Sequence, residues 1–155
     1  MSALLKENGV VSLMDVMNYK HDGLIERLQK VLHLDEKTAL ELFNDTKRFL
    51  FICGTRKGSF GPPELIDECW HNFILFTEDY EEFCHNFFGK FIHHRPKRKA
   101  EIAKGDGTPA RNTLKALSEI FGETHSKNWI YPQQNFTDCG GSTNCQDPPC
   151  SPPDY

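Results

Sequence analysis

Apolar residues recur at the spacing of an α-helix in successive segments of this chain, and this recurrence limits what the chain can fold into. In residues 22–32 and 36–53 they stand three or four positions apart, which places them on one face of each helix. The same spacing recurs in residues 62–76, 77–88 and 108–121. The sequence therefore predicts an all-α fold, a small single-domain bundle of about four to five helices.

Residues that favour helix ends bound these segments. Asp35 is suited to cap the segment that follows it, because its carboxylate can accept a hydrogen bond from a backbone N–H of the first turn. Proline is common in the first turn of a helix and glycine just after the last turn. The remaining predicted ends are Gly54, Pro62-Pro63, Thr77, Gly89, Thr108-Pro109 and Gly122.

The apolar pattern divides the chain into three parts. Residues 1–19 are weakly patterned and predict an N-terminal arm or one short helix around residues 13–17. Residues 20–130 form the predicted helical domain. Residues 131–155 are rich in Pro, Gly and Asn and contain cysteines, so we expect a flexible tail there.

Composition narrows the class of protein. The chain has 155 residues, of which 38% are hydrophobic and 26% charged, a balance typical of a soluble globular protein. The net charge of −4 makes a nucleic-acid partner improbable on electrostatic grounds. No apolar run has the length of a membrane span, and the N-terminal residues lack the pattern of a secretory signal. We therefore expect a cytoplasmic protein with reduced cysteines.

The residues most capable of chemistry lie between Asp67 and His94. Asp67 and His71 are four positions apart, which places them on the same face of a helix. If the chain folds back near Thr77, Cys84 and the pair His93-His94 can approach them. Imidazole, carboxylate and thiolate ligands suit zinc, or iron with open coordination positions. The sequence thus predicts a candidate metal site from Asp67, His71, Cys84, His93 and His94, although no fixed metal-ligand spacing is present.

The same residues permit a second interpretation. A histidine beside a tryptophan on a helix is often a packed and hydrogen-bonded residue, and Asp67 then only holds the ring of His71 in one tautomer. In that case the cluster is a structural polar network in a non-catalytic module that binds a protein or peptide partner. Neither interpretation predicts a reaction, and whether the protein is an enzyme stays open.

The other cysteines fall into two groups. Cys53 and Cys69 lie in apolar stripes and are expected to be small buried side chains. Cys139, Cys145 and Cys150 lie in the predicted tail, where no core accounts for them. Exposed thiols of this kind can bind a soft metal, form mixed disulfides or carry an acyl chain, and they can also be unselected composition.

One stretch of the sequence resembles a known family. The pattern Asp67-x-x-Trp70-His71, followed by His93-His94-x-Pro96, resembles the glycine-rich domain-containing protein-like family over residues 61–96. The resemblance implies that Trp70, Tyr80, Gly89 and Pro96 are structural residues of the motif, and that the cysteine-containing tail is a short version of the family's tail. It also implies that Phe73 replaces a second histidine present in many relatives. It implies no particular activity.

Overall fold

The computed structural model describes residues 12–96, 105–123 and 125–131, and it confirms the predicted all-α class. Within these ranges there are six α-helices and no strand. One of the six is the short N-terminal helix that the sequence allowed. The elements are α1 (Leu13–Asn18), α2 (Asp22–Leu32), α3 (Glu36–Thr55), α4 (Glu64–Ile74), α5 (Thr77–Phe88), α7 (Thr108–Phe121) and the 3-10 turn η2 (Lys127–Trp129).

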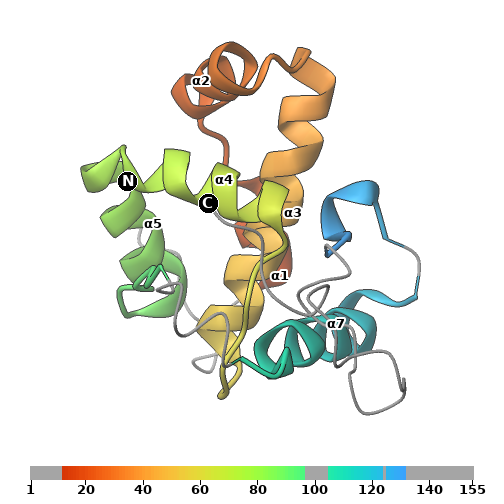
Figure 1. Cartoon of the computed structure of the whole chain (residues 1–155). Coiled ribbons are helices and arrows are strands. Elements are labelled where there is room, and N and C mark those ends of the chain that lie inside the picture. Colours follow the sequence, from red (N-terminus) through yellow and green to blue (C-terminus); the bar gives the residue numbers. More distant parts are fainter. Residues whose placement is uncertain (1–11, 97–104, 124, 132–155) are drawn as a thin grey trace.

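Helix α3 is the centre of the fold, because α1, α2, α4, α5, α7 and η2 all pack against it (Figure 1). The core between α3, α4 and α5 is largely aromatic. Phe73 of α4 lies edge-on to Phe43 of α3 at 5.3 Å between ring centroids, and edge-on to Phe83 of α5 at 5.2 Å. Edge-to-face aromatic pairs add about 0.5–1.5 kcal/mol each to the burial of their area. None of the described helices is long and apolar enough to cross a membrane.

Several of the predicted helix ends are confirmed. Oδ1 of Asp35 accepts the backbone N–H of Thr38 at 2.8 Å, as expected for an N-cap. Gly89 follows α5 in the left-handed conformation, with φ of 68°, and Gly122 follows α7 with φ of 89°. Left-handed φ values cost glycine little, because it has no Cβ atom to collide with the backbone.

Four of the predicted ends differ from the structure. Helix α4 begins at Glu64, so Pro62 and Pro63 precede its first turn, and Thr108 is the first residue of α7, with Gly107 in the capping position. Gly54 lies inside α3, which continues to Thr55, and the ring of Phe88 packs where a side chain at position 54 would stand. Thr77 is the first residue of α5 and makes no capping hydrogen bond; Phe76 is in the capping position instead. At Gly54 the close contact with Phe88 forms only when the helices pack, so the local pattern could not predict it.

Helix α1 is attached to α3 by a buried lysine. Nζ of Lys47 donates to the backbone carbonyls of Met17 and Tyr19, both at 2.8 Å, and so binds the C-terminal end of α1. The side chain is almost completely buried, and this burial lowers the pKa of Lys47 to about 8. Val16, a residue of α1 itself, is fully buried. Helix α1 therefore belongs to the core of the described fold.

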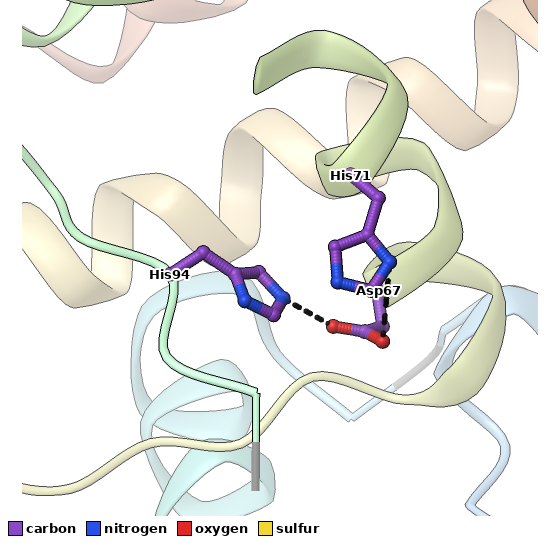
Figure 2. Close-up of side chains that lie close together, drawn as sticks. All are labelled: Asp67, His71 and His94. Atoms are coloured by element: carbon purple, nitrogen blue, oxygen red, sulfur yellow. Dashed lines mark hydrogen bonds and ion pairs between the residues drawn. The ribbon is translucent and has the colours of Figure 1, made fainter. Parts of the chain in front are cut away.

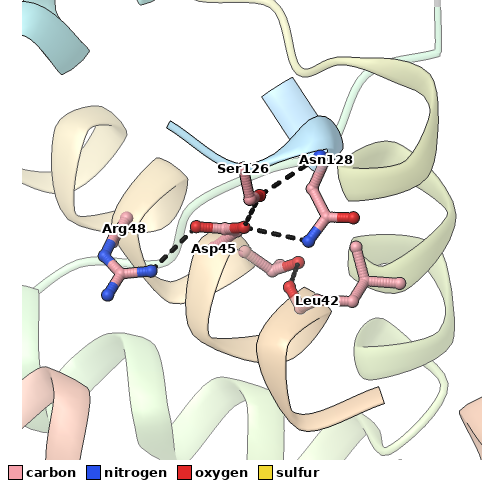
Figure 3. A network of polar contacts seen from close by, with 6 residues as sticks. Leu42, Asp45, Arg48, Ser126 and Asn128 are labelled. Atoms are coloured by element: carbon pink, nitrogen blue, oxygen red, sulfur yellow. Dashed lines mark hydrogen bonds and ion pairs between the residues drawn. The ribbon is translucent and has the colours of Figure 1, made fainter. Parts of the chain in front are cut away.

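The C-terminal described segment is held by a second buried charge, Asp45 of α3. Its carboxylate accepts hydrogen bonds from Arg48 at 2.8 Å, from Ser126 at 2.6 Å and from Asn128 at 2.9 Å (Figure 3). Beyond this network, Tyr131 is buried and its hydroxyl donates to the carbonyl of Gly61 at 2.5 Å. Residue 131, the first of the predicted tail, is therefore packed. The rest of that tail, with Cys139, Cys145 and Cys150, lies outside the described residues.

Candidate metal site

Helix α4 supplies two of the candidate ligands from one face. It begins after Pro63, and its core side buries Ile66, Trp70 and Phe73. Asp67 and His71 lie one turn apart at the edge of that buried side, where their side chains are 33% and 42% exposed. Nδ1 of His71 stands 3.8 Å from Oδ2 of Asp67, which is an ion-pair distance but too long for a hydrogen bond.

His94 reaches the same place from a different segment. The chain leaves α5 at Gly89 and runs without helix through residues 91–96. Nε2 of His94 lies 2.6 Å from Oδ1 of Asp67, and the side chain is only 10% exposed. The ring of His94 packs against the ring of Trp70 and the ring of His71, at 4.3 Å between centroids in each case. These tilted ring contacts and the hydrogen bond together fix where this imidazole stands.

Asp67, His71 and His94 therefore form one cluster in which the carboxylate contacts both imidazoles, one through each of its oxygens (Figure 2). One ligand atom from each residue lies within 4.8 Å of the other two. Around a tetrahedral zinc ion with bonds of about 2.0–2.2 Å, ligand atoms stand about 3.3 Å apart. To hold such an ion, the three ligand atoms would have to approach one another more closely than the 4.8 Å within which they lie, and the His94 nitrogen that faces Asp67 would have to carry no proton.

His93 and Cys84, which the sequence also suggested as ligands, do not belong to this cluster. His93 is exposed and its ring packs on Phe91, at 4.7 Å between centroids. Successive residues of an extended segment point to opposite sides, so His93 points away when His94 points in. Cys84 is fully buried in α5, and this burial raises the pKa of its thiol, which disfavours the thiolate that a metal requires.

The four residues expected to be structural, Trp70, Tyr80, Gly89 and Pro96, differ in burial and in position. Trp70 and Tyr80 are buried and joined by a hydrogen bond from the indole Nε1 to the phenol oxygen at 2.9 Å. Gly89 ends α5. Pro96 is exposed at the end of a described range. Of the remaining cysteines, Cys69 is fully buried as predicted, and burial raises its pKa to about 12. Cys53 is only partly buried.

Sequence reasoning found every member of the cluster but missed the central position of Asp67. The spacing of Asp67 and His71 on one helix suggested that the carboxylate supports His71. In the structure its shorter contact is with His94, which is 27 residues away in the chain. No local pattern signals a contact of that kind, because it depends on the path of the chain after α5.

Comparison with known proteins identifies the family. A family model described as UCP032817-like matches residues 12–120, which is more than half of the chain. The chain belongs to the UCP032817-like family. The expected membership of the glycine-rich domain-containing protein-like family is wrong, since the model that matches is a different one. The argument that Phe73 replaces a ligand histidine loses its basis with that membership.

The matched range of this UCP032817-like protein contains all three residues of the cluster. The description of the family names no activity. No curated protein and no solved structure is similar enough to the chain to count as a match. The function must therefore be argued from the site itself.

Proposed function

We propose that this protein binds a divalent transition metal ion, zinc before iron, through Asp67, His71 and His94. The observation that supports the proposal is the convergence of two imidazoles and one carboxylate, from two separate segments, within 4.8 Å. Two nitrogen ligands favour zinc or iron over magnesium and calcium, which prefer oxygen ligands throughout.

Three protein ligands leave a coordination position for water. His71 and Asp67 are 42% and 33% exposed, so water would have access to an ion held by these side chains. Zinc sites with three protein ligands and one water are the kind found in zinc enzymes, whereas structural zinc sites have four protein ligands. A bound ion of this type lowers the pKa of its water and can polarise a carbonyl or phosphoryl oxygen.

A second role for the cluster, as a purely structural network, is favoured by one observation. The contact of 2.6 Å between His94 and Asp67 already ties residues 91–96 to α4. The two roles differ in what they require of His71. Its contact with Asp67 is 3.8 Å long and its side chain is 42% exposed, so a structural network needs His71 little. A metal site needs it as a ligand.

The test follows from that difference. Protein purified without a histidine tag is titrated with zinc against a chromophoric chelator, and its thermal unfolding is measured with zinc and with excess chelator. His85→Ala is the matched control for His71→Ala, because His85 is also exposed on a helix and stands 3.9 Å from a carboxylate one turn away, Glu81.

We expect the unaltered protein and His85→Ala to bind one zinc ion and to unfold at a higher temperature with it. A ligand at about 100 times its dissociation constant adds about 2.7 kcal/mol to the free energy of unfolding. His71→Ala should lose zinc binding while its metal-free stability stays near that of the unaltered protein. Equal zinc binding by His71→Ala and His85→Ala would refute the site, and so would absence of binding by the unaltered protein.

A further inference from the structure

We infer that Tyr80 is a positioning residue for this metal site, because its phenol anchors the backbone next to His94 to the helix that carries Asp67 and His71. The inference rests on the proposed function. Among the described residues, the hydroxyl of Tyr80 makes its hydrogen bonds to Trp70 and Ile92 and not to Asp67, His71 or His94. Its effect on the site therefore passes through Trp70 and Ile92.

The phenol of Tyr80 joins three segments of the chain. It accepts the indole N–H of Trp70 in α4 at 2.9 Å and donates to the backbone carbonyl of Ile92 at 2.5 Å. Tyr80 itself lies in α5 and is fully buried. Because burial raises the pKa of Tyr80 above its ordinary value, the phenol keeps its proton and remains a donor at any working pH.

These two bonds lie next to the ligands in sequence. Trp70 immediately precedes His71, and Ile92 stands two residues before His94. The side chain of Ile92 is buried and that of His94 is only 10% exposed, so both point toward the core, and a shift of the Ile92 backbone would carry His94 with it. The ring of His94 then packs on the ring of Trp70, the same side chain that the phenol holds. One hydroxyl thus sets the distance between the helix-borne ligands and the third ligand.

Few other contacts of the backbone hold this segment. Among the described residues, no backbone–backbone hydrogen bond involves residues 90–94. The ring of Phe91 packs edge-on to the ring of Tyr80 at 5.2 Å, so this contact also depends on Tyr80. The thiol of Cys84 faces the backbone of Ile92 as well, but a thiol is a weak hydrogen-bonding group. The phenol is therefore the main polar partner of the segment's backbone, and it acts beside the side-chain contact between His94 and Asp67.

Metal affinity is sensitive to such an anchor. Ligands must be held within about 0.5 Å of their productive positions, and loss of an outer partner of a metal site commonly weakens binding about 10- to 100-fold. Tyr80→Phe removes the hydroxyl and keeps the ring. It leaves the carbonyl of Ile92 and the indole N–H of Trp70 without this partner, so residues 91–94 can shift away from α4.

The experiment compares Tyr80→Phe with Tyr131→Phe. The control is matched because Tyr131 is also buried and its hydroxyl also donates to a backbone carbonyl at 2.5 Å, that of Gly61. Zinc affinity is measured by competition with a chromophoric chelator, and the visible absorption of the cobalt(II) form reports the ligand geometry. Urea unfolding of the metal-free proteins measures the structural cost of each variant.

We expect Tyr80→Phe to bind zinc about 10- to 100-fold more weakly and to change the cobalt(II) spectrum. Tyr131→Phe should lose stability and keep the affinity and spectrum of the unaltered protein. If Tyr80→Phe binds zinc as tightly as Tyr131→Phe does, the inference is wrong and the metal site stands. If the unaltered protein binds no zinc, both fail. Should Tyr80→Phe not fold, Trp70→Phe, which removes the indole N–H and keeps a ring beside His94, must show the same selective loss of affinity.

Discussion

Gly54→Ala is the substitution for which the sequence and the structure predict opposite results. Gly54 lies inside α3, and in an exposed helix the replacement of glycine by alanine stabilises by about 1 kcal/mol. In this fold a Cβ atom at position 54 would stand 2.4, 2.6 and 2.8 Å from three ring atoms of Phe88. Carbon atoms pack at about 3.5–4.0 Å, so the ring would have to move by about 1 Å or more.

The cost of Gly54→Ala depends on how far the ring of Phe88 can move. Phe88 is buried at the end of α5, directly before Gly89, so its ring cannot turn away without moving the end of that helix. Overpacking of a core costs about 1–3 kcal/mol. After subtraction of the helix-propensity gain of about 1 kcal/mol, we expect Gly54→Ala to lower the free energy of unfolding by up to about 2 kcal/mol and not to raise it.

Gly23→Ala is the control for this prediction. Gly23 is also helical, in the first turn of α2, and a Cβ atom there would meet its nearest neighbours, ring atoms of His21 and Phe76, at 3.4 Å. We therefore expect Gly23→Ala to be neutral or stabilising. Urea unfolding of both variants at pH 7, followed by circular dichroism, gives the two free energies. A stabilised Gly54→Ala would refute the packing argument.

The remaining predictions concern the polar residues. Asp67→Asn should abolish zinc binding, as His71→Ala does. It should also lower the metal-free stability, which His71→Ala leaves unchanged, because Asp67 contacts both histidines. Metal titration and thermal unfolding measure the two effects, and retained zinc binding would contradict the prediction. Lys47→Met removes an ammonium whose pKa burial lowers from 10.5 to about 8. Between these pH values the unfolded chain holds the proton and the folded chain does not, so the unaltered protein should gain stability over Lys47→Met as pH rises from 8 to 10.5, by at most about 3 kcal/mol. Urea unfolding at both pH values measures this difference, and a constant difference would count against it. His33→Gly should stabilise the protein by about 1 kcal/mol. His33 follows α2 in the left-handed conformation, with φ of 54°, which glycine adopts at lower cost because it has no Cβ atom. Thermal unfolding measures the effect, and a lower melting temperature of His33→Gly would contradict it.

Much of this fold is encoded locally. The apolar spacing predicts the helices that the structure has, and Asp35, Gly89 and Gly122 act where short-range backbone chemistry predicts. The pairing of Asp67 with His71 is local too, because a helix brings residues four positions apart to one face whatever surrounds it. The sequence by itself therefore determined the fold class and the pairing of two of the three residues of the candidate site.

Only the tertiary structure decided the rest of the candidate site. Periodicity cannot distinguish His93 from His94, because in an extended segment either can point inward. In the structure His93 is exposed, whereas His94 is only 10% exposed and its Nε2 lies 2.6 Å from Oδ1 of Asp67, a contact between residues that are distant in the chain. Likewise, Cys84 is excluded because α5 turns it into the core, and position 54 has no room for a side chain because Phe88 of another helix fills the space beside it. Each outcome depends on which side chains meet after the helices pack, and that is a property of the whole fold rather than of any one segment.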